Sequence, residues 1–366
     1  MASATFHMAP VGIVGAIPLA IYHYNTSPTI MQTIFALPTL TAVPMSLIIG
    51  SLANRTGKKI PLQIGILAML IGGMAVVLFD LPLSLLIVAM ALIGLGLGCL
   101  MTLSAGLIAD HFKGAEQSKV MAHMSAFANM GGMVLATVGG ILMVFGFREA
   151  FWIFAFAVFI LIANHFCLDK NSIHPADKGK IKLNAEVFIL CGMVFILGLS
   201  FGIRSANIGL IVVDHKLGEI SVANYATTFW TAAGIVMGFS YGLIARTLKK
   251  SLLPLFIALF AVGMVIMGNT TILWLFYLGN ILAGMGIAAV MPTVISKAAQ
   301  SVDSYSSTFV ISIIFATLNI SNFAAPAVVN TIAGAVASVT AQVCFNIGAV
   351  FLAVLCVVSC FYVYKD

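Results

Sequence analysis

Charge is scarce in this chain, in which only 8% of the 366 residues are Asp, Glu, Lys or Arg and 61% are hydrophobic. Soluble domains average about 25% charged residues, so the composition excludes an ordinary soluble protein. Apolar runs of about 20 residues recur from end to end, and each is long enough to cross a hydrocarbon core as a helix. These runs are continuous rather than alternating, which excludes a membrane barrel. We therefore predict an all-α polytopic membrane protein.

Other features that the sequence lacks narrow its function. No lysine or arginine precedes Arg55, so we expect no cleavable signal peptide. The six cysteines show no CxxC spacing, which argues against disulfides and a metal site. GLSFG (198–202) and GFSYG (238–242) resemble a hydrolase elbow, but they lie inside apolar runs where no strand-to-helix turn is expected. We therefore predict no catalytic residues, no metal, no cofactor and no enzyme activity.

Breaks between the apolar runs predict twelve membrane helices. Their approximate ranges are 4–22, 28–52, 60–79, 83–109, 118–145, 149–167, 187–211, 221–245, 252–269, 271–296, 305–330 and 334–363. If the amino terminus is cytoplasmic, the inner loops and the carboxyl tail hold all 17 lysines and arginines except Arg148, Arg204 and Lys216. The positive-inside rule selects this orientation, with both termini in the cytoplasm.

Internal similarity indicates two six-helix halves. ALIGLGLGCLM (91–101) matches ILAGMGIAAVM (281–291), and GSLANRTGKK (50–59) matches GLIARTLKK (242–250), at nearly the same offset. The longest polar segment lies between the two copies. We predict an N-terminal half over 1–167, a cytoplasmic linker over 168–186 and a C-terminal half over 187–366.

The charged junction GSLANRTGKK resembles the signature Gly-x-Leu-Ala-Asp-Arg-x-Gly-Arg-Lys of the major facilitator superfamily, with Asn54 in place of the Asp. GLIADHF (106–112) and GFREAFWIF (146–154) are also similar to family segments. The resemblance implies alternating access between two halves, with Arg55 pairing with Asp110 as a latch; the alternative is that these cations only set topology. The expected gating residues are Gly50, Asn54, Arg55, Gly57, Lys58, Asp110 and Arg246.

One departure from the family pattern concerns the kind of substrate that is transported. Family antiporters often carry Gly-Pro-x-x-Gly-Gly late in the fifth helix, and here Leu135 and Ala136 stand where Gly-Pro would be, before Gly139 and Gly140. This departure weakens, without excluding, the interpretation as a drug/proton antiporter.

Arg204, in LSFGIRSANIG, is the sharpest candidate for a substrate site. A cation inside a membrane helix is costly, and it normally faces a cavity or a partner. Arg204 could instead reach outer headgroups or pair with Asp214 or Glu219. All eleven acidic residues fall in loops, in the tail or at helix ends, so the helices offer no buried carboxylate for a cationic substrate. We therefore expect Arg204 to bind an anionic group of the substrate.

Other candidates are polar or aromatic residues on helices that line the central cavity in the family. They are Asn129, Trp230, Tyr277, Asn280, Asn319 and Asn322. Each alone could be only an interhelical hydrogen-bonding residue.

Together these features predict a secondary active or facilitative transporter of a small anionic, carboxylate-type organic solute. A proton or a counter-anion is a possible coupling partner, and the protein is expected to be a monomer in a prokaryotic inner membrane that binds no nucleic acid. The alternatives are an efflux transporter of amphipathic drugs and a membrane sensor that does not transport.

Overall fold

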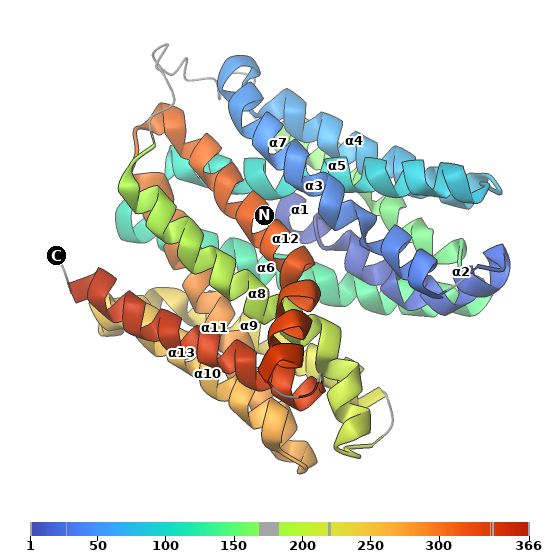
Figure 1. Cartoon of the computed structure of the whole chain (residues 1–366). Coiled ribbons are helices and arrows are strands. Elements are labelled where there is room, and N and C mark those ends of the chain that lie inside the picture. The colour runs from blue at the N-terminus through green and yellow to red at the C-terminus, as the bar shows by residue number, and fades with distance from the viewer. Residues whose placement is uncertain are drawn as a thin grey trace. The chain divides into compact units, whose positions relative to one another are not determined.

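The computed structural model describes residues 2–26, 28–167, 183–218, 221–336, 338 and 340–364, and these residues contain helices and no strand. Figure 1 shows the helices in chain order. The first part of the chain holds α1 (Ala2–Phe6), η1 (Ala9–Ala16), α2 (Ile17–Tyr24), α3 (Pro28–Thr56), α4 (Lys59–Leu78), α5 (Leu83–His111), α6 (Gly114–Leu142), η2 (Met143–Phe145), η3 (Glu149–Phe156) and α7 (Ala157–Cys167). The second part holds α8 (Ala185–Asp214), α9 (Ser221–Leu248), η4 (Lys249–Ser251), α10 (Leu252–Asn269), α11 (Leu273–Gln300), α12 (Ser304–Val336) and α13 (Ala341–Tyr364).

The all-helical membrane fold is confirmed. Ten stretches of the described residues are long and apolar enough to cross a membrane, and one of them, Tyr225–Asn269, covers most of α9 and all of α10. These stretches account for eleven of the twelve predicted helices, and the count of twelve is compatible with the structure.

The prediction of one continuous helix over 4–22 is wrong. This segment is divided into α1, the 3₁₀ helix η1 and α2. Pro10, at the start of η1, has no amide hydrogen to donate to the preceding turn, so a regular α-helix is interrupted there. Gly12 lies close to the neighbouring backbone, since a Cβ on it would stand 2.7 Å from the Leu135 carbonyl oxygen.

Residue contacts group the chain into two units. Unit 1 comprises Met1–Phe112, Phe127–Asn184 and Ala299–Ala316, and unit 2 comprises Lys113–Ala126, Ala185–Ala298 and Thr317–Asp366. The helices α6 and α12 therefore each contribute to both units. The division into halves at a linker over 168–186 stays a prediction, because most of that segment lies outside the described residues.

Within unit 1, α5 packs against both α3 and α4. Small residues permit this approach: a Cβ on Gly98 would lie 2.5 Å from the carbonyl oxygen of Ala42, and one on Gly94 would meet Pro38 and Thr41. The GLGLG segment therefore serves close helix packing, as its spacing suggests. Phe151 and Phe154 stack in the buried core beneath, with ring centroids 6.0 Å apart.

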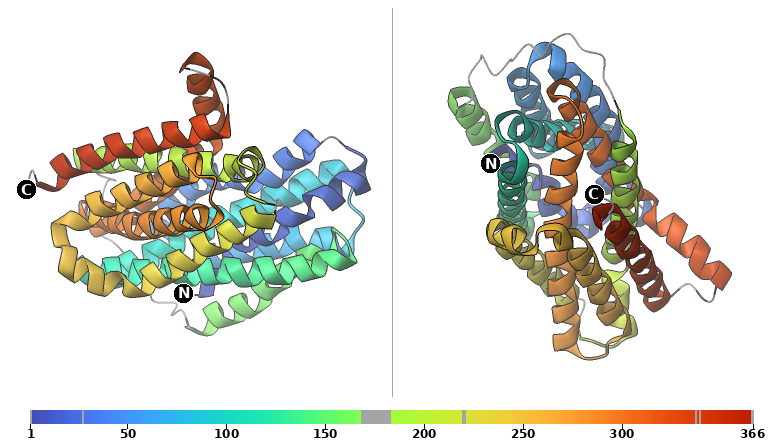
Figure 2. Two further views of the ribbon diagram at one scale, coloured as in Figure 1. Left: turned by 90° about the horizontal axis from the view of Figure 1, so that it is seen from below. Right: turned by 90° about the vertical axis from the view of Figure 1, so that its left-hand side faces the viewer.

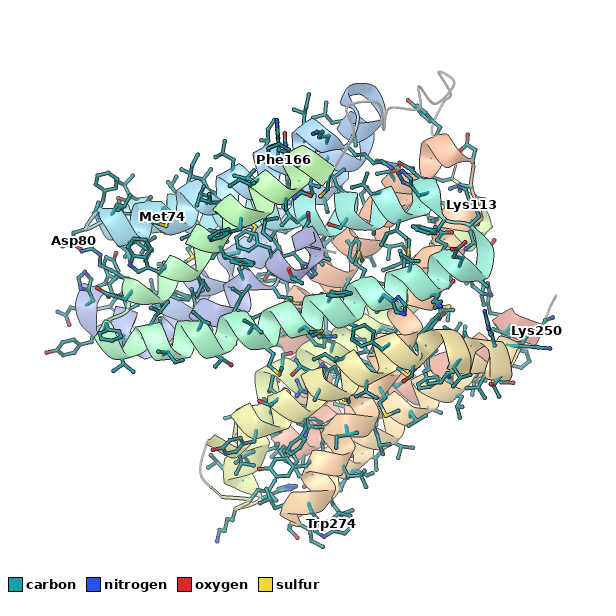
Figure 3. All side chains as sticks on the ribbon, turned by 180° about the vertical axis from the view of Figure 1, so that it is seen from behind. Met74, Asp80, Lys113, Phe166, Lys250 and Trp274 are labelled. Carbon is teal, nitrogen blue, oxygen red and sulfur yellow. The ribbon has the colours of Figure 1, made fainter. Side chains whose placement is uncertain are left out.

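Within unit 2, α13 contacts both α10 and α8, and the three helices can be followed in Figure 2. A lysine and a tryptophan mark opposite ends of α10. Lys250 lies in η4, just before α10, whereas Trp274 lies beyond the other end of α10, and Figure 3 shows the two at opposite ends. Basic residues at one helix end and a tryptophan at the other are typical of a helix that spans a bilayer.

Candidate functional site

The Arg204 side chain lies inside unit 2 and is only 3% exposed. Ten residues of α8, about 15 Å of helix, separate it from the helix end at Asp214. Burial at this depth does not fit an arginine that reaches outer headgroups. In the part of the chain that the structure describes, no carboxylate lies within ion-pair distance of Arg204, and Asp214 is exposed. Glu219 lies outside the described residues.

The partners of Arg204 are neutral. Its Nε and Nη2 atoms both donate to Oδ1 of Asn280 on α11, at 3.2 and 2.8 Å. Its guanidinium carbon lies 4.1 Å from the ring centroid of Trp230 on α9, a cation–π geometry. Three of the seven residues predicted to bind substrate therefore meet in one cluster, which we call the Arg204 cluster: Arg204, Trp230 and Asn280.

Local packing holds this cluster in place. The Trp230 ring contacts the rings of Phe201 and Phe260, with centroids 6.0 and 5.7 Å away. Gly284 brings α11 against the backbone of α9, since a Cβ on it would lie 2.5 Å from the Trp230 carbonyl oxygen. Asn280 is fully buried, and its Nδ2 donates to the Phe276 carbonyl oxygen at 2.9 Å. Helices α8 to α11 thus all contribute to the position of the guanidinium.

The other predicted substrate residues lie around or away from this cluster. Tyr277 is one turn from Asn280, and its ring contacts that of Phe229 in a tilted arrangement, with centroids 4.9 Å apart. Asn322 lies against α8, because a Cβ on Gly202 would stand 2.8 Å from its Oδ1. Asn319 is 7% exposed on the same helix. Asn129 is half-buried in the part of α6 that belongs to unit 1, so it is described separately from this cluster.

Sequence reasoning missed Asn207, which is buried one turn along α8 from Arg204 and donates through Nδ2 to the Ile203 carbonyl oxygen at 2.9 Å. Its signal in the sequence is the spacing of three residues from Arg204, which places both side chains near one helix face.

The charged junction lies in unit 1 between α3 and α4. Lys58 is 6% exposed, and its Nζ donates to Asp110 Oδ2 at 2.6 Å and to the Gly106 carbonyl oxygen at 2.9 Å. Gly57, at φ +78°, makes the turn that ends α3. The side chains of Asn54 and Arg55 lie outside the described residues, so the predicted pairing of Arg55 with Asp110 stays a prediction.

Two further gating candidates are placed differently. A Cβ on Gly50 of α3 would collide with Ser312 of α12, so α3 and α12 approach closely at this point. Arg246 is exposed near the end of α9.

These elements define a polytopic helical membrane protein with a charged junction in one unit and a buried arginine in the other. A family model described as Major Facilitator Superfamily matches residues 1–189, more than half of the chain. The chain belongs to the Major Facilitator Superfamily.

Solved structures of the same fold cover nearly the whole chain. The proton:xylose symporter XylE has a TM-score of 0.76 and 12% identity, with 100% of this chain and 94% of that chain covered. The human organic anion transporter MFSD10 has a TM-score of 0.75 and 12% identity, with 98% and 97% covered. The fucose:proton symporter FucP of E. coli has a TM-score of 0.74 and 14% identity, with 98% and 97% covered.

A curated relative is the quinolone resistance protein NorB of Staphylococcus aureus (strain Newman), 25% identical over 255 residues, 69% of this chain and 50% of the relative. The chain thus spans about half the length of the curated relatives it matches. The family model and the solved structures agree on the fold, that of a multi-pass helical membrane protein.

Proposed function

We propose that the protein transports a small organic anion and that Arg204 binds its negative group. One observation carries this proposal: a guanidinium that is 3% exposed has an amide oxygen and an indole ring as its partners, and no described carboxylate neutralises it. A buried charge without a counter-charge is costly, and a bound anion would remove that cost.

The remaining parts of the proposal concern topology and gating. Both termini are cytoplasmic, the membrane is a prokaryotic inner membrane and the protein acts as a monomer, coupled to a proton or a counter-anion. The Lys58–Asp110 ion pair, flanked by Gly50, Gly57 and Arg55, holds one alternating-access state at the cytoplasmic side. Arg246 occupies the corresponding junction of the second internal copy.

The test uses the full chain, purified and reconstituted into proteoliposomes. A thermal-shift screen against organic anions identifies ligands, and flux of each hit is then measured. We expect Arg204→Ala to lower anion flux at least about 100-fold, because removing one member of a buried charge contact costs several kcal/mol. Lys216→Ala is the matched control, since Lys216 is an exposed cation just beyond the same helix, and its flux should equal that of the original chain. Unchanged flux in Arg204→Ala would overturn the proposal.

A second candidate function is export of amphipathic drugs, which the likeness to NorB, named for quinolone resistance, favours. This function predicts flux of neutral amphipathic compounds that persists in Arg204→Ala. The anion proposal predicts that neutral compounds are transported poorly by both proteins.

A further inference from the structure

The hydrogen bonds of Arg204 occupy only one edge of its guanidinium group. A guanidinium carries five N–H donors in one plane. Nε and Nη2 share the Oδ1 atom of Asn280, at 3.2 and 2.8 Å, so the side edge of the group is taken. Nη1 makes no hydrogen bond to any residue in the described part of the chain. The end edge, formed by Nη1 and the second N–H of Nη2, therefore holds the donors that remain for a ligand.

Asn280 is fixed in the orientation that produces this arrangement. Its Nδ2 donates to the Phe276 carbonyl oxygen at 2.9 Å, one turn back on α11, which turns Oδ1 toward Arg204. The side chain is fully buried, so water does not compete for it. Asn280 also differs from an aspartate in one respect that matters here: it accepts hydrogen bonds without neutralising the positive charge.

Trp230 covers one face of the guanidinium plane at 4.1 Å. The indole is held by Phe201 and Phe260 and by the close approach of Gly284, so it limits rotation of the guanidinium about its long axis. A ligand on Arg204 is thereby restricted to the plane of the group or to its other face. Two carboxylate oxygens match two coplanar N–H donors, and this bidentate geometry is the strongest that a guanidinium forms.

Charge and polarity around the cluster narrow the ligand class. Arg204 is the one buried charged side chain among the described residues of unit 2. The Trp230 ring faces its guanidinium and is itself packed against the rings of Phe201 and Phe260. A single cation in such surroundings suits a ligand with one negative charge and an apolar body.

We infer that Asn280 and Trp230 are positioning residues that present the end edge of Arg204 to a monocarboxylate with an apolar body. This inference rests on the proposed function and names the substrate class of the same site. A planar carboxylate places both oxygens on the end edge, whereas the third oxygen of a sulfonate lies out of the plane. The indole fills one of the two sides available to that oxygen. The site therefore favours carboxylates over sulfonates of the same body.

The experiment measures binding of benzoate, benzenesulfonate and benzamide to the purified full chain, together with benzoate flux in proteoliposomes. The original chain should bind benzoate more tightly than benzenesulfonate and should not bind benzamide measurably. Asn280→Asp keeps the side-chain shape and supplies a resident carboxylate. Its benzoate affinity should fall by about 30-fold or more, because the guanidinium charge is then already neutralised. Asn280→Asp should be more stable than Asn280→Ala, because both variants lose the hydrogen bond to the Phe276 carbonyl oxygen and only the aspartate gains an ion pair with Arg204.

Asn280→Ala provides a second variant in case Asn280→Asp does not fold. Without the amide the guanidinium gains freedom, so the preference for benzoate over benzenesulfonate should fall toward one, and KM for benzoate should rise more than kcat changes. Trp230→Phe, which keeps a smaller ring, should retain more of the preference than Trp230→Ala.

The outcomes separate the two proposals. If no organic anion binds the original chain in an Arg204-dependent manner, both the proposed function and this inference are overturned. If benzoate binding depends on Arg204 but is unchanged in Asn280→Asp, and the preference is unchanged in Asn280→Ala, only the positioning role is overturned.

Discussion

Lys58 in unit 1 and Arg204 in unit 2 are both buried cations, 6% and 3% exposed, yet their surroundings differ. Lys58 meets a carboxylate, Asp110, at 2.6 Å and a backbone carbonyl at 2.9 Å. Arg204 meets an amide oxygen and an indole ring. Lys58 is therefore neutralised by its own unit, whereas no carboxylate among the described residues neutralises Arg204.

The side-chain types suit these two situations. A lysine ammonium is a compact point charge that one carboxylate and one carbonyl can satisfy. A guanidinium spreads its charge over a planar group and can lie against the face of an aromatic ring. It also has five N–H donors, so three remain after two have formed hydrogen bonds. Burial alone therefore does not separate a cation of the fold from a candidate substrate group; the resident partner is what differs between Lys58 and Arg204.

The largest effect on stability is expected from Asp110→Asn. This change leaves the Lys58 ammonium buried without a counter-charge, and we expect a loss of about 3 kcal/mol, the size seen when one member of a buried pair is removed. Denaturation of the purified protein in detergent measures the loss. The double variant Lys58→Met with Asp110→Asn removes both charges and should recover most of it.

Asp80→Asn is the matched control for this prediction. Asp80 also has cationic neighbours, His23 at 3.2 Å and Arg148 at 3.9 Å, but its side chain is 68% exposed. Figure 3 shows it at one end of the unit 1 helices. Exposed pairs contribute about 0–1 kcal/mol, so this variant should stay close to the original stability. Equal losses in Asp80→Asn and Asp110→Asn would contradict the distinction between buried and exposed pairs.

Much of the fold could be predicted from the sequence, because membrane helices are recognised as long apolar runs. In lipid the backbone must satisfy its hydrogen bonds internally, which a helix does. Arg204 is found for the same reason: a cation in such a run is too costly to be incidental. The segment over 4–22 was harder, since its residues are apolar whether the backbone is α-helical or 3₁₀, and composition does not separate the two.

The sequence alone did not show which residues pair with the buried cations Lys58 and Arg204. Arg55 and Lys58 lie within one turn of each other at the junction, so either could reach Asp110 by spacing alone. The placement of Lys58 depends on the turn at Gly57, φ +78°; the glycine predicts a turn at the end of the helix but not which cation the turn directs toward Asp110. Asn207, in contrast, was within reach, because it lies three residues from Arg204 on a helix already identified.

Arg204→Met should change stability much less than Asp110→Asn. Replacing a buried charge by an apolar side chain of similar length removes its desolvation cost but leaves Asn280 Oδ1 without its donors, so we expect a net change within about 1 kcal/mol. Anion binding should be lost in the same protein, so stability and binding separate. Denaturation and benzoate binding on one preparation measure both. A loss of 2 kcal/mol or more would mean that Arg204 is a structural group, as Lys58 is, and would contradict the comparison.

The smallest effect is expected at Tyr362 in unit 2, where a third cation has a neutral partner. Lys297 Nζ lies 4.8 Å from the Tyr362 ring centroid, and Tyr362 Oη donates to Glu186 Oε1 at 2.6 Å. Lys297 is half-buried, so water replaces part of what the ring supplies. Tyr362→Phe keeps the ring and loses the hydrogen bond, which should cost about 0.5–1 kcal/mol in a denaturation experiment.

Tyr362→Leu also removes the ring. It should lower the free energy of unfolding by about 0.5–1 kcal/mol more than Tyr362→Phe does, which is the size of an exposed cation–π contact. Neither variant should change benzoate affinity, because Lys297 is partly solvated and does not depend on a ligand for its neutralisation. Benzoate affinity that falls in Tyr362→Leu as far as in Arg204→Met would show that a ring partner alone marks an anion site. The anion site that we propose requires more than a ring partner: a buried guanidinium with an aromatic ring on one face and an amide oxygen on one edge.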